Sequence, residues 1–245
     1  MAEVLFYVSA FFAELTGTIA GFGSSTILLP IALLFFDFRI ALVLVAFFHL
    51  SGGIGRILFF RRSFNKTLLV VFGVPSVVLT VAGALLVNYV PQSWLKIVLG
   101  VFLIVYALVS LVKKEVRVSA NSRNAVVGGG LSGFFAGLIG TGGVLRGAFL
   151  TAFGLEKSVY IATATVISVA VDITRIPVYV ASGFLEPQFY LSVLILAVLA
   201  ILGSFVGNRI VKHIPQSAFL KIVLVAIILV SIKLVYDGFF QVFTT

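Results

Sequence analysis

The chain has 245 residues, of which 61% are hydrophobic and only 10% are charged. Ordinary soluble domains are roughly 45–50% apolar and about 25% charged, so these proportions exclude a water-soluble globular domain. Apolar stretches recur along the whole chain, which predicts an all-α polytopic membrane protein whose first partner is the lipid bilayer. The net charge of +9 is typical of basic loops that set membrane topology, so we expect no nucleic-acid partner.

Ten apolar segments are separated by short polar or glycine-rich stretches. The second and the seventh contain only 12 and 11 residues. A helix rises about 1.5 Å per residue, so each falls well short of a hydrocarbon core of ~30 Å. Each short segment and its predecessor either form a re-entrant hairpin or make two crossings, and both alternatives stay open. The expected segments are 4–19, 25–36, 40–60, 68–88, 95–112, 125–139, 144–154, 158–180, 189–209 and 218–236.

The lysines and arginines between the segments predict the orientation. If both termini lie outside, eleven of them fall inside and three fall outside, as the tendency of basic loops to stay in the cytoplasm requires. The inside set is Arg61, Arg62, Lys66, Lys113, Lys114, Arg117, Arg123, Lys157, Arg209, Lys212 and Lys221, and the outside set is Arg39, Lys96 and Lys233.

The chain contains an internal repeat. The stretch PQSWLKIVLG from Pro91 returns nearly unchanged as PQSAFLKIVL from Pro215. Each copy holds five segments, an odd number, so the second copy must enter the membrane from the opposite side. We expect two inverted repeats, 1–112 and 125–245, joined by a cytoplasmic linker at 113–124, an organisation typical of secondary transporters. Further pairs lie 119 residues apart (Gly21 and Gly140, Gly23 and Gly142, Arg56 and Arg175) or 124 apart (Gly83 and Gly207, Val87 and Val211).

Two glycine-rich stretches, GTIAGFGSSTILLP from Gly17 and GLIGTGGVLRGAF from Gly137, occupy matching positions in the repeats. Glycine permits sharp turns and lets backbone N–H groups approach a ligand, and the short helix that follows directs its positive end to the same place. This pattern favours an anion, although the same residues also suit helix capping and close helix packing. The substrate-binding candidates here are Gly21, Gly23, Ser24, Ser25, Gly140, Thr141, Gly142, Gly143 and Arg146.

Arg56 and Arg175 lie within apolar segments at matching positions, and both are candidate anion ligands. A planar guanidinium can donate to two oxygens of one oxyanion. Two alternatives stay open: Arg56 could extend to lipid headgroups, and Arg175 could form an ion pair with Asp172 three residues earlier.

Glu14, His49 and Asp172 are candidates for proton or charge coupling. Glu14 could instead neutralise an arginine, and His49 could be a hydrogen-bonded residue of the helix bundle. The chain has no cysteine, no HExxH motif and no paired histidines, so we expect no enzyme activity, no metal site and no cofactor.

The two glycine-rich stretches, the length and the two halves joined by a basic loop resemble the sulfite exporter TauE/SafE family of membrane permeases. The family pattern is G-x-G-G-G followed by a proline in each copy. The first copy here has Gly21-Phe22-Gly23-Ser24-Ser25 with Pro30, whereas the second has Gly140-Thr141-Gly142-Gly143-Val144 with Phe149 in place of the proline.

The resemblance implies export of sulfite or an organosulfur anion across the bacterial inner membrane. Three kinds of protein are compatible with the pattern: an exporter working by alternating access, an anion channel, and a membrane-embedded enzyme or assembly factor of sulfur metabolism. A homodimer is also left open.

Overall fold

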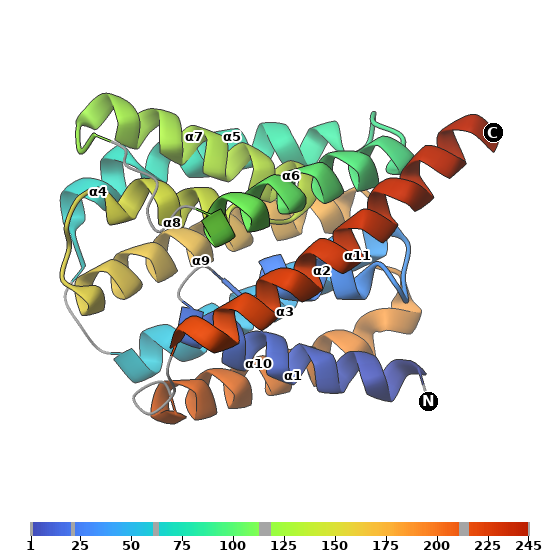
Figure 1. Cartoon of the computed structure of the whole chain (residues 1–245), viewed down its shortest axis with the longest axis horizontal. Coiled ribbons are helices and arrows are strands. Elements are labelled where there is room, and N and C mark those ends of the chain that lie inside the picture. Colours follow the sequence, from blue (N-terminus) through green and yellow to red (C-terminus); the bar gives the residue numbers. More distant parts are fainter. Residues whose placement is uncertain (1, 21–22, 61–63, 113–118, 211–215, 245) are drawn as a thin grey trace.

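The computed structural model describes residues 2–20, 23–60, 64–112, 119–210 and 216–244. Within these ranges every regular element is a helix, which confirms the all-α prediction, and the long helices run side by side in one bundle (Figure 1). The elements are α1 (Ala2–Ala20), α2 (Ser25–Ala32), α3 (Phe38–Phe60), α4 (Lys66–Val71), α5 (Gly73–Leu86), α6 (Gln92–Val112), α7 (Ser122–Ile139), α8 (Gly143–Thr151), α9 (Lys157–Ala181), the 3-10 helix η1 (Pro187–Phe189), α10 (Tyr190–Ile210) and α11 (Gln216–Thr244).

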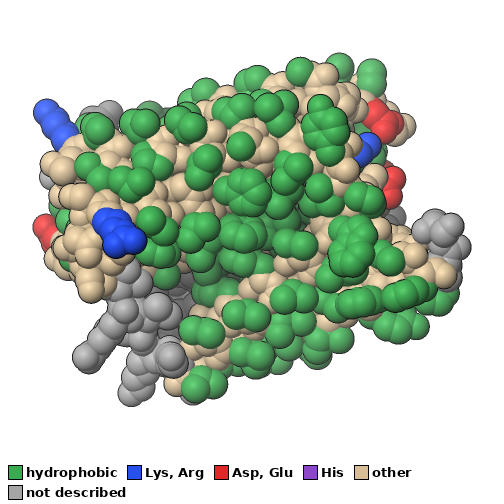
Figure 2. Space-filling view, turned by 90° about the horizontal axis from the view of Figure 1, so that it is seen from above, with side chains coloured by type: hydrophobic (Ala, Val, Ile, Leu, Met, Phe, Trp, Pro, Cys, Tyr) green, Lys and Arg blue, Asp and Glu red, His purple; other side chains and the backbone are tan. Residues whose placement is uncertain are grey.

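The protein is a multi-pass membrane protein. Six stretches among the described residues are long and apolar enough to cross a bilayer. Figure 2 shows hydrophobic side chains covering one long face of the bundle, with charged side chains near its two ends. The six stretches are Phe38–Leu58, Lys66–Leu86, Gln92–Val112, Lys157–Ala181, Pro187–Arg209 and Leu224–Phe243.

The helix bounds depart from the sequence expectation where local chemistry intervenes. The segment expected at 68–88 is interrupted at Phe72, because Pro75 has no N–H to donate to the carbonyl of Val71. Residues 113–118 of the expected linker lie outside the described residues, and the segment expected at 125–139 begins earlier, since α7 starts at Ser122. There the side chain of Asn121 accepts a hydrogen bond of 2.8 Å from the Asn124 backbone N–H and caps the helix.

The two ends of the bundle differ in charge. Both termini lie at one end, which we call the terminal end (right in Figure 1), where α3 and α6 begin with Arg39 and Lys96 in their first two turns. The end of α3, the end of α10 and the starts of α4, α7 and α9 lie at the opposite end. We call this the basic end, and its exposed described cations are Lys66, Arg123, Lys157 and Arg209.

Small residues bring α5 and α7 into backbone contact. A Cβ atom added to Gly133 would lie 1.9 Å from the Ser76 carbonyl oxygen, and one added to Gly137 would lie 2.2 Å from that of Thr80. The hydroxyl of Ser76 donates to the Gly129 carbonyl at 2.8 Å. Close approach through glycines, supported by hydroxyl hydrogen bonds, is the usual way to join helices in lipid. Elsewhere in the bundle α10 packs on α1, α3 on α9 and α6 on α11.

Candidate functional site

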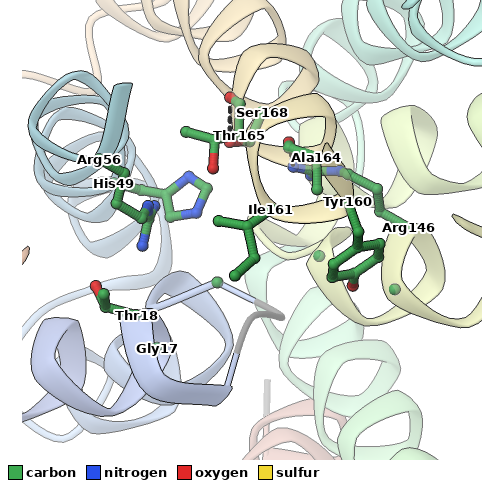
Figure 3. A pocket seen from close by; sticks show the side chains of 13 residues that line it. Gly17, Thr18, His49, Arg56, Arg146, Tyr160, Ile161, Ala164, Thr165 and Ser168 are labelled. Atoms are coloured by element: carbon green, nitrogen blue, oxygen red, sulfur yellow. Dashed lines mark hydrogen bonds between the residues drawn. The ribbon is translucent and has the colours of Figure 1, made fainter. Parts of the chain in front are cut away.

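A buried cavity lies where α1, α3, α8 and α9 meet (Figure 3). About 30 Å³ of it is open to the centres of water-sized molecules, which leaves room for a few waters or one small ion. Its charged or titratable lining consists of arginine, histidine and tyrosine, and no carboxylate belongs to it among the described residues. The lining residues are Gly17, Thr18, Gly23, His49, Arg56, Gly143, Arg146, Gly147, Tyr160, Ile161, Ala164, Thr165 and Ser168.

The cavity lies between the middle of the bundle and the basic end. Its α9 residues, 160–168, belong to the first half of a helix that starts at the basic end. Its α8 residues belong to the first turns of a short helix that starts inside the bundle. The candidate site is therefore closer to the basic end than to the terminal end.

Arg56 reaches the cavity from α3 and is held by Glu14 on α1. Arg56 Nη1 donates to Glu14 Oε1 at 2.9 Å, and the two side chains are 7% and 0% exposed. The same carboxylate oxygen accepts from the hydroxyls of Thr18 and Ser204, each at 3.2 Å. Room for the carboxylate comes from Gly52, where an added Cβ would lie 2.5 Å from it. Glu14 thus neutralises Arg56 and fixes its position, and the guanidinium is buried in the bundle.

His49 lines the cavity and is joined through Asp172 to Arg175. His49 Nδ1 and Asp172 Oδ2 are 2.7 Å apart, and Arg175 Nε donates to Asp172 Oδ1 at 2.9 Å. Arg175 Nη1 also donates to the backbone carbonyls of Ala136 at 2.7 Å and Gly140 at 3.0 Å. The guanidinium of Arg175 is therefore occupied by protein groups behind the cavity and does not line it, whereas the ion pair with Asp172 that the sequence left open is present.

Arg146 enters the cavity from α8 and has few partners. Its side chain is buried, its Nη1 donates to the Ala164 carbonyl at 3.2 Å, and its Nε has no hydrogen-bond partner among the described residues. No described carboxylate lies within ion-pair distance of it. A buried cation without a counter-ion costs several kcal/mol. The site is consequently short of one negative charge at this position.

The buried charges of the described residues support the same conclusion. Three buried side chains are arginines and two are carboxylates. With His49 neutral, the sum is one positive charge. The excess lies beside a cavity whose described lining contains no carboxylate, so the arrangement suits an anion.

A comparison with protein families matches residues 6–234 to the sulfite exporter TauE/SafE family. The chain belongs to this family. The resemblance seen in the sequence is confirmed, and the chain is a membrane transporter of the sulfur-anion class. No curated protein and no solved structure matches the chain.

The glycines of the TauE/SafE-like stretches fall into two groups. Gly23, with a φ of 97°, and Gly143 line the cavity. Gly140 has a φ of 74° and ends α7, while an added Cβ at Gly142 would lie 2.0 Å from the Ser132 carbonyl oxygen. Gly140 and Gly142 shape the turn before α8 and do not line the cavity. Gly21 lies outside the described residues.

The hydroxyl candidates lie behind the cavity. Thr141 Oγ1 is 2.7 Å from Thr26 Oγ1, which joins the starts of the two short helices. Ser24 and Ser25 are buried at the start of α2, and neither lines the cavity. Ser24 precedes the helix without making a side-chain capping bond. These three residues therefore lie at the starts of the two short helices and do not line this cavity.

Sequence reasoning missed the α9 face of the cavity, which carries Tyr160, Ile161, Ala164 and Thr165. The signal was present, because Ser168 and Asp172 already mark one face of α9. Following that face from Ser168 two turns toward the start of the helix reaches the four missed residues. Among the described residues no group of three metal-ligating side chains occurs.

Proposed function

We propose that this TauE/SafE family member is a secondary transporter that binds a small sulfur oxyanion, such as sulfite, in the cavity between α3, α8 and α9. Arg146 carries this proposal, because it is a buried cavity-lining cation that lacks a carboxylate partner among the described residues. Arg56 supplies a second guanidinium from the opposite wall. Two planar guanidinium groups can donate to several oxygens of one oxyanion.

Alternating access between two inverted repeats is the mechanism we infer. It is supported by corresponding contacts between the proposed repeats, since α5 of the first packs on α7 of the second and α10 of the second packs on α1 of the first. It is also supported by the two short helices, α2 and α8, that follow glycine turns in each half. Helices interrupted at matching positions are typical of transporters whose site lies between the repeats. Arg175 then acts as a positioning residue, because it binds the Gly140 carbonyl at the end of α7.

Export is the direction that the charges favour. We place the basic end in the cytoplasm of a bacterium and the protein in the inner membrane, because basic loops stay inside. The cavity, which is closer to that end, would then receive its anion from the cytoplasm. An inside-negative potential contributes about 2.3 kcal/mol per charge per 100 mV to an anion that leaves the cell. Export therefore requires no further energy source.

Transport by purified protein in liposomes tests the proposal. Wild-type protein should give sulfite uptake that saturates and is accelerated by unlabelled sulfite inside the vesicles. Such counterflow requires a carrier, whereas a channel would pass current without it. Vesicles that show neither behaviour would favour an enzyme or assembly factor.

Arg146→Gln should reduce sulfite transport at least tenfold, since a hydrogen bond to a charged group contributes about 1.5–3 kcal/mol. Arg123→Gln is the matched control, because Arg123 is exposed in the first turn of α7. Equal transport by the two variants would exclude Arg146 from the binding site.

A further inference from the structure

His49 presents its two ring nitrogens to different surroundings. Nδ1 is 2.7 Å from Asp172 Oδ2, while a Cβ atom added to the cavity-lining Gly23 would lie 3.0 Å from Nε2. Nε2 thus points to the side of the ring away from Asp172, beside Gly23. Figure 3 shows the imidazole next to Arg56 and facing Ile161 across the cavity.

The partners of Asp172 determine which ring nitrogen carries the proton. Asp172 Oδ1 accepts from Arg175 Nε at 2.9 Å and pairs with Nη2 at 2.8 Å, so the carboxylate is ionised. An ionised carboxylate only accepts hydrogen bonds, which means that Nδ1 of His49 must donate. In the neutral imidazole Nε2 then carries a lone pair, and adding a proton turns it into a donor beside the cavity.

The charge of the bound ligand determines whether Nε2 of His49 carries a proton, because the buried charges must balance. With neutral His49, the buried described side chains sum to one positive charge: Arg56, Arg146 and Arg175 against Glu14 and Asp172. A singly charged anion compensates this sum. A doubly charged anion leaves one negative charge uncompensated in a buried site, which is costly unless a further positive charge appears.

Every other charged group around His49 already has a partner or a fixed charge. On its own helix Arg56 is paired with Glu14 of α1. On α9 Asp172 is shared between His49 and Arg175, and Tyr160 lines the far wall. On α8 Arg146 is a permanent cation. Among the described residues of α1 and the α1–α2 turn, the cavity is lined by Gly17, Thr18 and Gly23, none of which is charged. His49 is thus the group whose charge can change near neutral pH.

We propose that His49 takes up one proton at Nε2 when a divalent oxyanion binds in the cavity, so that this anion is carried together with a proton. The inference rests on the proposed function, because it needs an anion in this cavity. The proton comes from solvent and adds to the Nε2 lone pair, while Nδ1 keeps its bond to Asp172. The bound state has the same net charge for a monovalent anion with neutral His49 as for a divalent anion with charged His49.

Proton uptake on binding tests this inference in the full-length protein. Titration calorimetry in buffers of different ionisation enthalpy counts the protons taken up. Sulfite is used at a pH where it is almost entirely the dianion, and methanesulfonate is the matched monoanion with the same SO₃ head. We expect about one proton per bound sulfite, none per methanesulfonate, and about tenfold weaker sulfite binding for each pH unit above the pKa of His49.

The site of the added proton is read directly from the nitrogen-15 spectrum of imidazole-labelled protein. The chain has two histidines, and His213→Gln leaves the signal of His49 alone. A charged imidazole with sulfite and a neutral one with methanesulfonate would support the proposal. A neutral imidazole with sulfite bound, or binding of sulfite without proton uptake, would overturn it and leave the proposed function intact. Failure of both anions to bind would overturn both.

Discussion

The hydroxyl oxygens of Thr26 and Thr141 lie 2.7 Å apart and join α2 to α8. The two residues come from the two halves of the chain, and each lies close to a glycine with positive φ, Gly23 or Gly140. Both hydroxyls are fully buried. This contact joins the two short helices directly, so a separation of α2 from α8 must break it.

Cross-linking this contact should stop transport. The chain has no cysteine, so Thr26→Cys with Thr141→Cys introduces a single possible disulfide. If α2 and α8 separate in each transport cycle, oxidation should block sulfite transport and a reductant should restore it. Each single cysteine variant, treated in the same way, is the control. Full transport by completely cross-linked protein would show that the two short helices move together.

The effects of replacing Glu14 and Arg56 on the free energy of unfolding should be strongly non-additive, because the two side chains form a buried ion pair. Glu14→Gln leaves a buried guanidinium without its counter-ion and should cost about 3–5 kcal/mol. Adding Arg56→Gln removes the orphaned charge, so the double variant should be more stable than Glu14→Gln alone. The measurement is the free energy of unfolding of each variant in the same detergent.

An exposed ion pair provides the comparison for the Glu14 and Arg56 variants. Lys233 and Asp237 form an i,i+4 ion pair whose side chains are 58% and 34% exposed. Asp237→Asn should therefore change stability by at most about 1 kcal/mol. Equal costs for Asp237→Asn and Glu14→Gln would show that burial adds nothing to the contribution of the Glu14–Arg56 pair.

Contact between α5 and α7 should be sensitive to a single methyl group. Gly133→Ala places a Cβ 1.9 Å from the Ser76 carbonyl oxygen, so the helices must separate, at a cost of about 1–3 kcal/mol. Gly73→Ala on α5 is the matched control, because its Cβ would lie 3.5 Å from Ile167 in ordinary contact. The stability of both variants is measured as the yield of folded protein and the midpoint of thermal unfolding. Unchanged stability of Gly133→Ala would show that the two backbones are not in contact.

Much of the fold could be predicted from the sequence because lipid imposes strong composition rules. Apolar length predicted the six stretches that can span a bilayer, and Gly23 and Gly140, both in the predicted glycine-rich stretches, have positive φ. The break at Phe72 was not predicted, although Pro75 provides a local reason for it.

The candidate site was harder to predict, because the sequence identifies polar residues in apolar segments without their partners. Arg56, Arg146 and Arg175 were all chosen as ligands, yet Arg175 is occupied by Asp172 and by two backbone carbonyls. That difference depends on tertiary contacts between α7 and α9. Only the contacts in space distinguish an arginine that has its partners from one, such as Arg146, that lacks a counter-ion.

Cysteine accessibility in cells should test the proposed inverted arrangement of the two repeats. Matching helices α5 and α10 end at opposite ends of the bundle: Tyr89, 82% exposed, lies just beyond α5 at the terminal end, and Arg209 lies in the last turn of α10 at the basic end. Tyr89→Cys should react with a membrane-impermeant maleimide in intact cells. Arg209→Cys should react only after permeabilisation, as should the control Ala120→Cys beside α7, and the cysteine-free parent should not react. Labelling of positions 89 and 209 from the same side would make the repeats parallel, and alternating access between inverted halves would then have no structural basis.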